Sequence, residues 1–341
     1  MNMAQMTFDQ WLPVIFIGLM GFAVLIYAIL DGYDLGVGIL LPLDDNDIAH
    51  EHRNKMISSI GPFWDANETW LVLAVGIMLI AFPAAHSEIL YHLYIPASLM
   101  LIGLIMRGVA FDFRTKATME YRKLWNQLFK LGSLVTTLTQ GYMLGQYVVS
   151  FDKSPSSIAF SLLSAVCVSA AFSYIGAAWL IMKTEGELQK RAIKWAKWSG
   201  RATLLGVIAV SIVNTVINPF VYERWFQYPL VMFALLIPAI ALMCFVLNDS
   251  LLKRLPKAND KYCWLPFVYV IIIFLTSFIG LAFSFFPDIV PGKLTIWETA
   301  SAPESLAFIL VGAVIVIPVI LMYTVFSYRV FHGKATDLKY Y

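Results

Sequence analysis

The stretch Tyr27–Gly38, with the sequence YAILDGYDLGVG, constrains the fold of this chain more than any other. It lies toward the far end of an apolar run that begins near Trp11, and it brings two carboxylates, Asp31 and Asp34, into that run. A charged side chain near the centre of a bilayer costs about 3 kcal/mol on insertion scales, so these acids should face protein or water. Being three residues apart, they share one face of a helix.

Two glycines accompany these acids. Gly32 and Gly36 form a pair of small residues four positions apart, which lets a neighbouring helix approach the backbone closely. We therefore expect Asp31 and Asp34 to be buried against another helix.

The composition excludes an ordinary soluble fold. Hydrophobic residues make up 60% of the 341 positions and charged residues only 13%, which is typical of an integral membrane protein. No basic patch is interleaved with aromatic residues, so we expect no nucleic-acid partner. The first apolar run is too long for a signal peptide and should remain as the first span.

Apolar windows of about 20 residues, the length that crosses a bilayer, recur along the whole chain. Backbone polar groups in lipid must be satisfied within their own segment, so these windows should be helices. We predict an all-α integral membrane fold in which residues 1–341 form a single polytopic domain with about nine transmembrane helices. The windows are about 11–41, 56–82, 88–113, 119–150, 157–183, 200–220, 228–248, 264–286 and 305–331.

The basic residues predict the orientation. The loops after even-numbered spans hold only Lys153, Arg224 and Lys293, whereas nearly all other lysines and arginines lie after odd-numbered spans. The positive-inside rule then places the N-terminus outside and the C-terminus in the cytoplasm, which requires an odd number of spans. Residues 183–201 are either an amphipathic helix at the membrane surface or a plain basic loop.

Ionisable residues gather toward the predicted cytoplasmic side of the first four spans. The bases are Arg107 and Lys130, with Arg114 at the boundary. The acids are Asp31, Asp34, Asp65, Glu68 and Asp112. A set of buried ion pairs should balance in sign, because an orphan buried charge is expensive. The excess of acids instead predicts carboxyl groups that accept and release protons along a polar path from the cytoplasm.

Each acid also has a structural alternative. Asp65 follows Pro62 and fits a first-turn acid that complements the helix dipole. Asp34 fits a cap or an ion pair with Arg107, and Glu68 fits a pair with Arg107 or Lys130. Asp31 is too deep for a cap. Arg107 and Asp112 are best explained as a structural ion pair.

Metal and haem ligands are not evident in the sequence. The histidines lie in loops or at the ends of spans, and none occupies the middle of a helix where a buried haem would be ligated. They are His50, His52, His86, His92 and His332. No nucleotide-binding or nucleophile motif occurs in a fitting context. We expect this chain to hold no metal and no redox centre of its own.

Three segments together resemble one known family. They are Ala28–Gly38, Gly61–Trp70 with the sequence GPFWDANETW, and Arg107–Arg114. This combination is similar to subunit II of the cytochrome bd-type quinol oxidases of the bacterial inner membrane, and the length and spans fit the remainder.

The resemblance implies two four-helix bundles plus one peripheral helix. It also implies a partner, subunit I, that carries haems b and d and the quinol site and reduces oxygen to water. A small single-span third chain often accompanies the pair, and some relatives hold a structural quinone in subunit II.

The resemblance further implies a role for particular acids. Asp65 matches the family's acid on a proton route toward the haems, and Asp31 and Asp34 match its buried acids. Two other functions compete with this one. A proton-coupled transporter would place acids at mid-membrane in both halves of the chain, whereas here they cluster toward one side. A scaffold would pair every acid.

Overall fold

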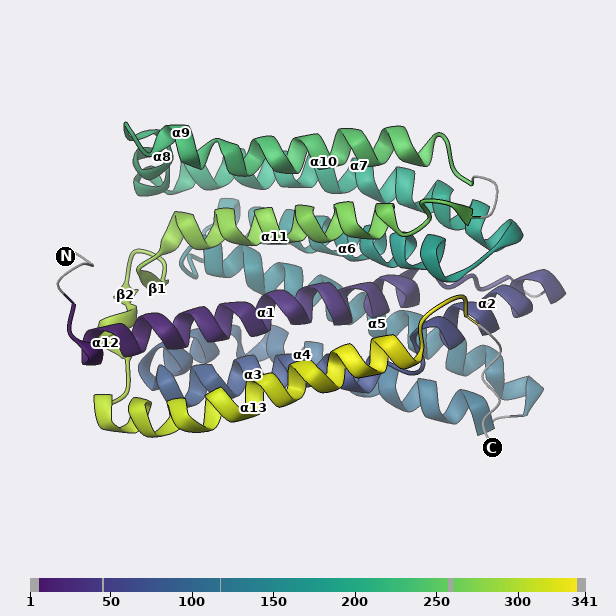
Figure 1. The fold of residues 1–341 in the computed structure, drawn as a ribbon, viewed down its shortest axis with the longest axis horizontal. Coiled ribbons are helices and arrows are strands. Elements are labelled where there is room, and N and C mark those ends of the chain that lie inside the picture. Colours follow the sequence, from purple (N-terminus) through teal and green to yellow (C-terminus); the bar gives the residue numbers. More distant parts are fainter. Residues whose placement is uncertain (1–5, 45, 117, 257–259, 336–341) are drawn as a thin grey trace.

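The computed structural model describes residues 6–44, 46–116, 118–256 and 260–335, and its long helices run side by side (Figure 1). Eight of the described helical segments are long and apolar enough to cross a membrane. They confirm an all-α integral membrane protein. Their ranges are Phe8–Leu40, Trp64–Ala81, Pro83–Arg114, Pro155–Lys183, Gly186–Ile217, Val231–Leu252, Leu265–Phe285 and Pro303–Val330.

The fourth predicted window, 119–150, coincides with helix α5 (Met119–Val148), which is not one of these eight. Helix α5 is as long as the others, but it carries Arg122, Lys123 and Lys130 together with several amides and hydroxyls. It packs along α4 (Pro83–Lys116) and α6 (Pro155–Lys183). The polar residues of α5 lower its mean hydropathy, which is why apolar composition alone does not identify this helix as a span.

The second predicted window is wrong at its start. The chain forms α2 (Asp47–Ile60), breaks at Gly61–Phe63, and resumes as α3 (Trp64–Ala81). Pro62 has no amide hydrogen to donate and restricts the residue before it, so a helix is interrupted there. The break makes Trp64 the first residue of α3 and places Asp65 in its first turn.

Most of the segment 183–201 is helical, as in the first of the two structures considered, but the helix does not end with the segment. Helix α7 (Gly186–Ile217) runs continuously from this segment through the predicted span that follows it. Trp198 is 75% exposed on its surface, whereas Ala192 and Ala196 are buried. The basic segment is thus the first half of a long helix.

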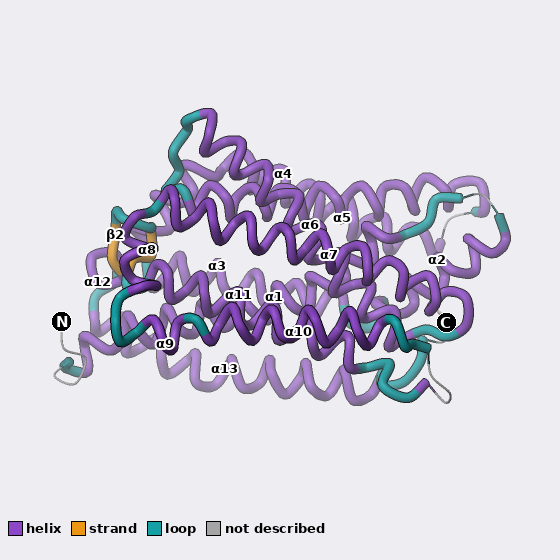
Figure 2. Tube along the Cα trace, turned by 90° about the horizontal axis from the view of Figure 1, so that it is seen from above, coloured by secondary structure: helices purple, strands orange, loops and turns teal. Residues whose placement is uncertain are grey.

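The remaining elements complete the chain. Helices α8 (Pro219–Phe226) and α9 (Val231–Ala234) lead into α10 (Leu236–Leu252), which is followed by α11 (Leu265–Phe285). A short antiparallel hairpin, β1 (Asp288–Val290) and β2 (Leu294–Thr295), and α12 (Ile296–Thr299) then precede α13 (Pro303–Val330). The hairpin and α12 lie at the end where α1 (Phe8–Leu40) begins, and α13 runs along one edge (Figures 1 and 2).

Helix α1 is central to the packing. It contacts α3, α5 and α6 along its length, and α11 and α13 more lightly. A Cβ added at Gly36 would lie 2.6 Å from the carbonyl carbon of Phe172 and 3.1 Å from the Cα of Gly176, and would overlap the Phe172 carbonyl oxygen. The close approach expected at the small-residue pair is therefore confirmed, and the neighbour is α6.

We predict that Gly36→Ala lowers the thermal stability of the detergent-solubilised protein, because the added methyl group meets backbone that cannot move aside. Overpacking of this kind costs about 1–3 kcal/mol. The matched control is Gly18→Ala in the same helix, where an added Cβ meets nothing within 4 Å. Equal unfolding midpoints for the two variants would contradict the close α1–α6 contact.

Candidate functional site

The candidate site is centred on Arg107, which α4 places in the interior. Its side chain is fully buried. A Cβ at Gly132 of α5 would lie 2.9 Å from the Arg107 backbone nitrogen, so the absence of a side chain there lets α4 and α5 pack closely at this level. On another side the guanidinium carbon lies 6.0 Å from the ring centre of Trp64. The backbone around Arg107 is thereby fixed by neighbouring helices.

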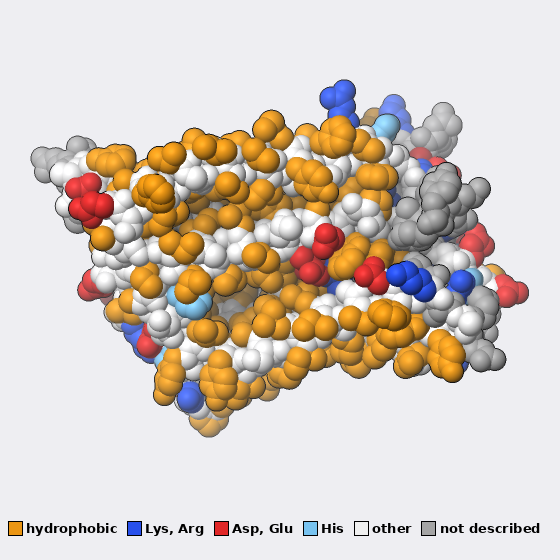
Figure 3. Space-filling model, turned by 90° about the horizontal axis from the view of Figure 1, so that it is seen from below, with side chains coloured by type: hydrophobic (Ala, Val, Ile, Leu, Met, Phe, Trp, Pro, Cys, Tyr) orange, Lys and Arg blue, Asp and Glu red, His pale blue; other side chains and the backbone are white. Residues whose placement is uncertain are grey.

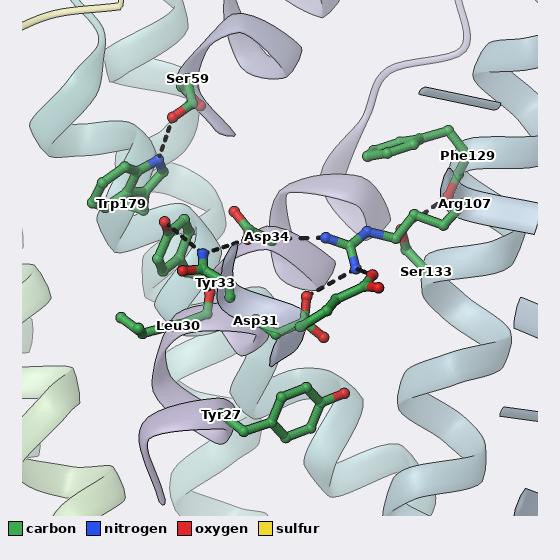
Figure 4. A network of polar contacts seen from close by, with 12 residues as sticks. Tyr27, Leu30, Asp31, Tyr33, Asp34, Ser59, Arg107, Phe129, Ser133 and Trp179 are labelled. Carbon is green, nitrogen blue, oxygen red and sulfur yellow. Dashed lines mark hydrogen bonds and ion pairs between the residues drawn. The ribbon is translucent and has the colours of Figure 1, made fainter. Parts of the chain in front are cut away.

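Three carboxylates surround this one guanidinium (Figure 4). Its Nη1 donates to Asp31 Oδ1 at 2.8 Å and to Glu68 Oε1 at 2.7 Å. Its Nη2 lies 3.9 Å from Asp34 Oδ2. Asp31 and Asp34 are fully buried, whereas the Glu68 side chain is 26% exposed. The cluster therefore has two enclosed acids and one that reaches the surface of the chain.

The local sequence explains how the three acids converge. Asp31 and Asp34 lie one turn apart on the buried end of α1, where every residue from 31 to 38 is buried. Glu68 follows from the second turn of α3, which begins only after the Gly61–Phe63 break. The predicted shared face of the two aspartates is confirmed.

Formal charges in the cluster do not balance. One guanidinium can neutralise one of the three carboxylates if all are ionised. Lys130 does not supply the difference, because its Nζ donates to the Leu41 carbonyl at 2.8 Å, at the end of α1. Asp31 Oδ2 and Asp34 Oδ1 are buried oxygens with no hydrogen-bond partner among the described atoms. Both acids therefore retain an oxygen on which a proton or a bridging water can be held.

The other predicted site residues lie farther out. Asp65 is in the first turn of α3 and exposed, one turn before Glu68. Asp112, predicted as the partner of Arg107, lies on the exposed side of α4, while Arg107 is joined to acids of α1 and α3. Arg114 donates to Asn126 at 2.6 Å and to Asn54 at 2.5 Å, outside the cluster.

Several polar residues of the site were not predicted. Asn67 donates to Asp34 Oδ2 at 2.7 Å, and Gln140 donates to the Tyr27 hydroxyl at 2.5 Å. Tyr33 and Tyr328 join their hydroxyls at 2.5 Å. Asn67 and Tyr33 lie inside the sequence motifs that contain the acids, and this position could have identified them as site residues. Tyr328 is 295 residues from Tyr33 and has no local signal in its own apolar helix.

Acidic side chains also interrupt an otherwise largely apolar face of the molecule (Figure 3). The exposed stripe of α3 that contains Glu68 continues with Val72, Val75 and Leu79, which are 72%, 43% and 51% exposed. This spacing of four, three and four residues defines one helix face. An acid on such a face would be costly against lipid.

Metal ligands do not converge in the part of the chain that the structure describes. No group of three or more His, Cys, Asp or Glu side chains there could hold a metal ion. His92 lies near the beginning of α4, where its Nε2 is 3.2 Å from Glu88 Oε1 and its ring stacks on Phe151.

The sequence of this chain matches one family along nearly its whole length. The family is described as cytochrome bd terminal oxidase subunit II, and the match covers residues 12–331. The chain belongs to this family. It is therefore a multi-pass membrane subunit of an oxidoreductase complex of respiratory electron transport.

Individual relatives agree with this assignment. Cytochrome bd ubiquinol oxidase subunit 2 of Bacillus subtilis is 28% identical over 96% of both chains. Cytochrome bd-I ubiquinol oxidase subunit 2 of Escherichia coli K12 is 28% identical over 93% of both chains. A chain in the structure of bd oxidase from Geobacillus thermodenitrificans superposes with a TM-score of 0.76, at 18% identity, covering 94% of this chain and 98% of that one. The last comparison shows the shared fold.

We predict that Arg107→Gln destabilises this subunit by about 3–5 kcal/mol, because buried carboxylates would lose the cation that they share. The fall should appear as a lower unfolding midpoint in detergent. Adding Asp31→Asn should recover part of the loss, since one fewer negative charge is then left uncompensated. Arg329→Gln, at an exposed arginine in the last turn of α13, is the control. An Arg107→Gln variant as stable as this control would contradict the shared ion pairing.

Proposed function

We propose that this chain is the haem-free second subunit of a quinol-oxidising cytochrome bd-type oxidase, which stabilises the haem-bearing subunit I and lines a cytoplasmic proton path. The observation that carries this proposal is the enclosure of one guanidinium by three carboxylates, one of which reaches the surface. In the oxidase, quinol supplies the electrons that reduce oxygen to water in subunit I, and protons are consumed there. This chain's part is to deliver protons.

The proton path follows from charge and position. Asp65 is exposed at the start of α3, and Glu68 is partly exposed. Asp31 and Asp34 are fully buried. A cluster with three carboxylates and one cation in a low-dielectric interior favours binding a proton over keeping an excess of negative charge. A proton taken up at Asp65 can pass to Glu68 and be shared with the aspartates. The guanidinium keeps the oxygens within reach of one another.

The first alternative for Asp65 is a helix-dipole acid, and its first-turn position is also consistent with that role. The two roles differ in consequence. A dipole acid affects the stability of α3, whereas a proton-path acid affects turnover of the assembled oxidase. The exposure of Asp65 one turn from partly exposed Glu68 favours the second role.

We place subunit I on the face formed by α3 and α4. The stripe Glu68, Val72, Val75 and Leu79 is too acidic at one end to face lipid and too apolar beyond it to face water. On α4, Leu101 and Ile105 are 53% and 65% exposed. A hydrophobic partner with polar groups opposite Asp65 and Glu68 would cover both parts.

The haems b and d, the quinol site and any small single-span subunit belong to the partner side in this proposal, and no residue here identifies a structural quinone.

The proposed topology has nine spans, with α5 as the ninth. Helices α1, α3, α4 and α5 form one four-helix bundle, α6, α7, α10 and α11 form the other, and α13 is peripheral. Within these bundles α1 packs on α3, α4 on α5, α6 on α7 and α10 on α11, and the two bundles meet where α6 packs on α1 and α5. The basic residues favour an outside N-terminus and a cytoplasmic C-terminus in a bacterial inner membrane, so that α3 begins near the cytoplasmic side.

We predict that Asp65→Asn in the assembled oxidase lowers quinol-dependent oxygen consumption by about tenfold or more, equivalent to at least about 1.4 kcal/mol in the barrier. The charge moved across proteoliposome membranes should fall in parallel, with haem content unchanged. Glu187→Gln, at an exposed acid in the first turn of α7, is the control. Wild-type turnover and charge movement in Asp65→Asn would refute the proton path and leave the scaffold role.

A tagged copy of this chain, extracted gently from its native membrane, should carry haem absorbance and a second large hydrophobic chain. This result follows if the α3–α4 face is covered by subunit I. Introducing charge into that face by Val72→Lys should reduce the recovered haem, whereas Val216→Lys, at a similarly exposed position of α7, should not. Recovery of the chain alone, with proton-dependent solute uptake in vesicles, would favour the transporter.

A further inference from the structure

A second set of hydrogen bonds ties the buried acids to the last helix. Asn67 Nδ2 donates to Asp34 Oδ2 at 2.7 Å and to the Tyr33 hydroxyl at 3.0 Å. The Tyr328 hydroxyl of α13 donates to Asn67 Oδ1 at 3.2 Å, and the two tyrosine hydroxyls are 2.5 Å apart. Asn67 and Tyr33 are almost completely buried. We call Asn67, Tyr33 and Tyr328 the amide–tyrosine triad.

When Asp34 is ionised, the donors and acceptors of the amide–tyrosine triad can be assigned as one closed cycle. An ionised carboxylate only accepts, so the Asn67 amide must turn its NH₂ group toward Asp34. Its oxygen then accepts from Tyr328, whose own oxygen accepts from Tyr33, and the Tyr33 oxygen accepts the second Asn67 hydrogen. The Asn67 Nδ2 also lies 3.4 Å from the Leu30 carbonyl oxygen, and these contacts together fix the orientation of the amide. Removing either hydroxyl breaks the cycle and leaves the amide with fewer partners that hold its orientation.

Asp34 is held by this cycle more closely than by the arginine. Its Oδ2 lies 2.7 Å from the Asn67 amide nitrogen but 3.9 Å from Arg107 Nη2. Its Oδ1 has no hydrogen-bond partner among the described atoms. The direction in which Asp34 presents its unoccupied oxygen is therefore set by Asn67, and through Asn67 by Tyr328.

The position of Tyr328 is itself fixed from two sides. Its ring stacks on Phe63 with centroids 4.4 Å apart and planes at 21°. Just beyond α13, the Lys183 Nζ donates to the Phe331 carbonyl at 2.8 Å, and the Ala335 amide donates to the Lys183 carbonyl at 2.7 Å. Lys334 is joined to Asp260. These contacts anchor the segment after α13 to the end of α6 and to the connection between α10 and α11, so the hydroxyl of Tyr328 has a defined place.

We infer that Tyr328, acting with Tyr33 through Asn67, is a positioning residue that orients Asp34 for proton transfer within the carboxylate cluster. This inference rests on the proposed proton path. It adds that the peripheral helix α13, which contributes no acid to the cluster, controls the rate at which the cluster passes protons. The packing role of the Tyr328 ring is separate, because phenylalanine preserves the stack on Phe63 and removes only the hydroxyl.

The test compares Tyr328→Phe with Tyr323→Phe in the assembled oxidase. Tyr323 lies in the same helix and is 59% exposed. We expect Tyr328→Phe to lower kcat roughly threefold to tenfold, as when one hydrogen bond no longer holds a transferring group. The KM for quinol and the haem spectrum should not change, because neither site includes this hydroxyl. Tyr323→Phe should behave as wild type, and Tyr33→Phe should reproduce the Tyr328→Phe effect.

A double-mutant comparison tests whether the hydroxyl acts through Asp34. Tyr328→Phe added to Asp34→Asn should lower kcat no further than Asp34→Asn alone, since the group being oriented no longer carries protons. Full additivity would overturn the inference. Wild-type kcat in both Tyr328→Phe and Tyr33→Phe, with Asp34→Asn slow, would also overturn it and leave the proton path intact. Wild-type kcat in Asp34→Asn would refute the proton path and the inference with it. If Tyr328→Phe fails to assemble, Tyr33→Phe decides by the same criterion.

Discussion

The structure depends on the burial of a single guanidinium among three carboxylates. Arg107 of α4 reaches Asp31 of α1 and Glu68 of α3, and Asp34 lies at the edge of the same group. Removing charges from water costs several kcal/mol per ion, and the cost is recovered only if partners and hydrogen bonds surround them. The close packing of α4 on α5 and of α1 on α6 supplies that enclosure. The same interaction therefore fixes the register of three helices and concentrates acids at one level of the membrane.

The excess of carboxylates over cations is the feature that connects this cluster with the proposed proton transfer. A balanced pair would serve as a structural bridge, whereas three acids around one base leave carboxyl oxygens that can hold protons. The gradient of burial from Asp65 through Glu68 to Asp31 and Asp34 gives the arrangement a direction. Membership in the cytochrome bd terminal oxidase subunit II family places this chain in a respiratory oxidase complex, and the proposed function assigns the proton-consuming step to its partner. The exposed acids on an apolar face of α3 are where the two polypeptides would meet.

Much of the fold and part of the site could be predicted from the sequence. Apolar length alone located the spans to within a few residues in most cases, and the three-residue spacing of Asp31 and Asp34 placed both on one buried face. The sequence also indicated Arg107 as one of two possible ion-pair partners of Glu68. Prediction was wrong at the start of α3, because the apolar window continued across the Gly61–Phe63 break, and at α7, where a basic half and an apolar half form one helix.

What could not be predicted depends on contacts between distant segments. Local periodicity assigns each residue to a face of its helix but does not show which helices become neighbours. It therefore predicted Asp112, in the same helix, as the ion-pair partner of Arg107. The hydroxyl of Tyr328 meets Asn67 across 261 residues of sequence, and nothing in the surrounding apolar run distinguishes this tyrosine from Tyr323. The Asn67 amide that orients Asp34 lies in a motif recognisable by its acids and aromatics, yet its role becomes evident only when α3 and α13 are seen together.

The proton content of the cluster tests the central claim most directly. Infrared difference spectra of the assembled oxidase, recorded between its reduced and oxidised states in H₂O and in D₂O, report carboxylic acid groups that gain or lose a proton. The account predicts a carbonyl band that shifts in D₂O and disappears when Asp34 or Glu68 is replaced by its amide. A spectrum without such a band, or one that both replacements leave unchanged, would contradict it.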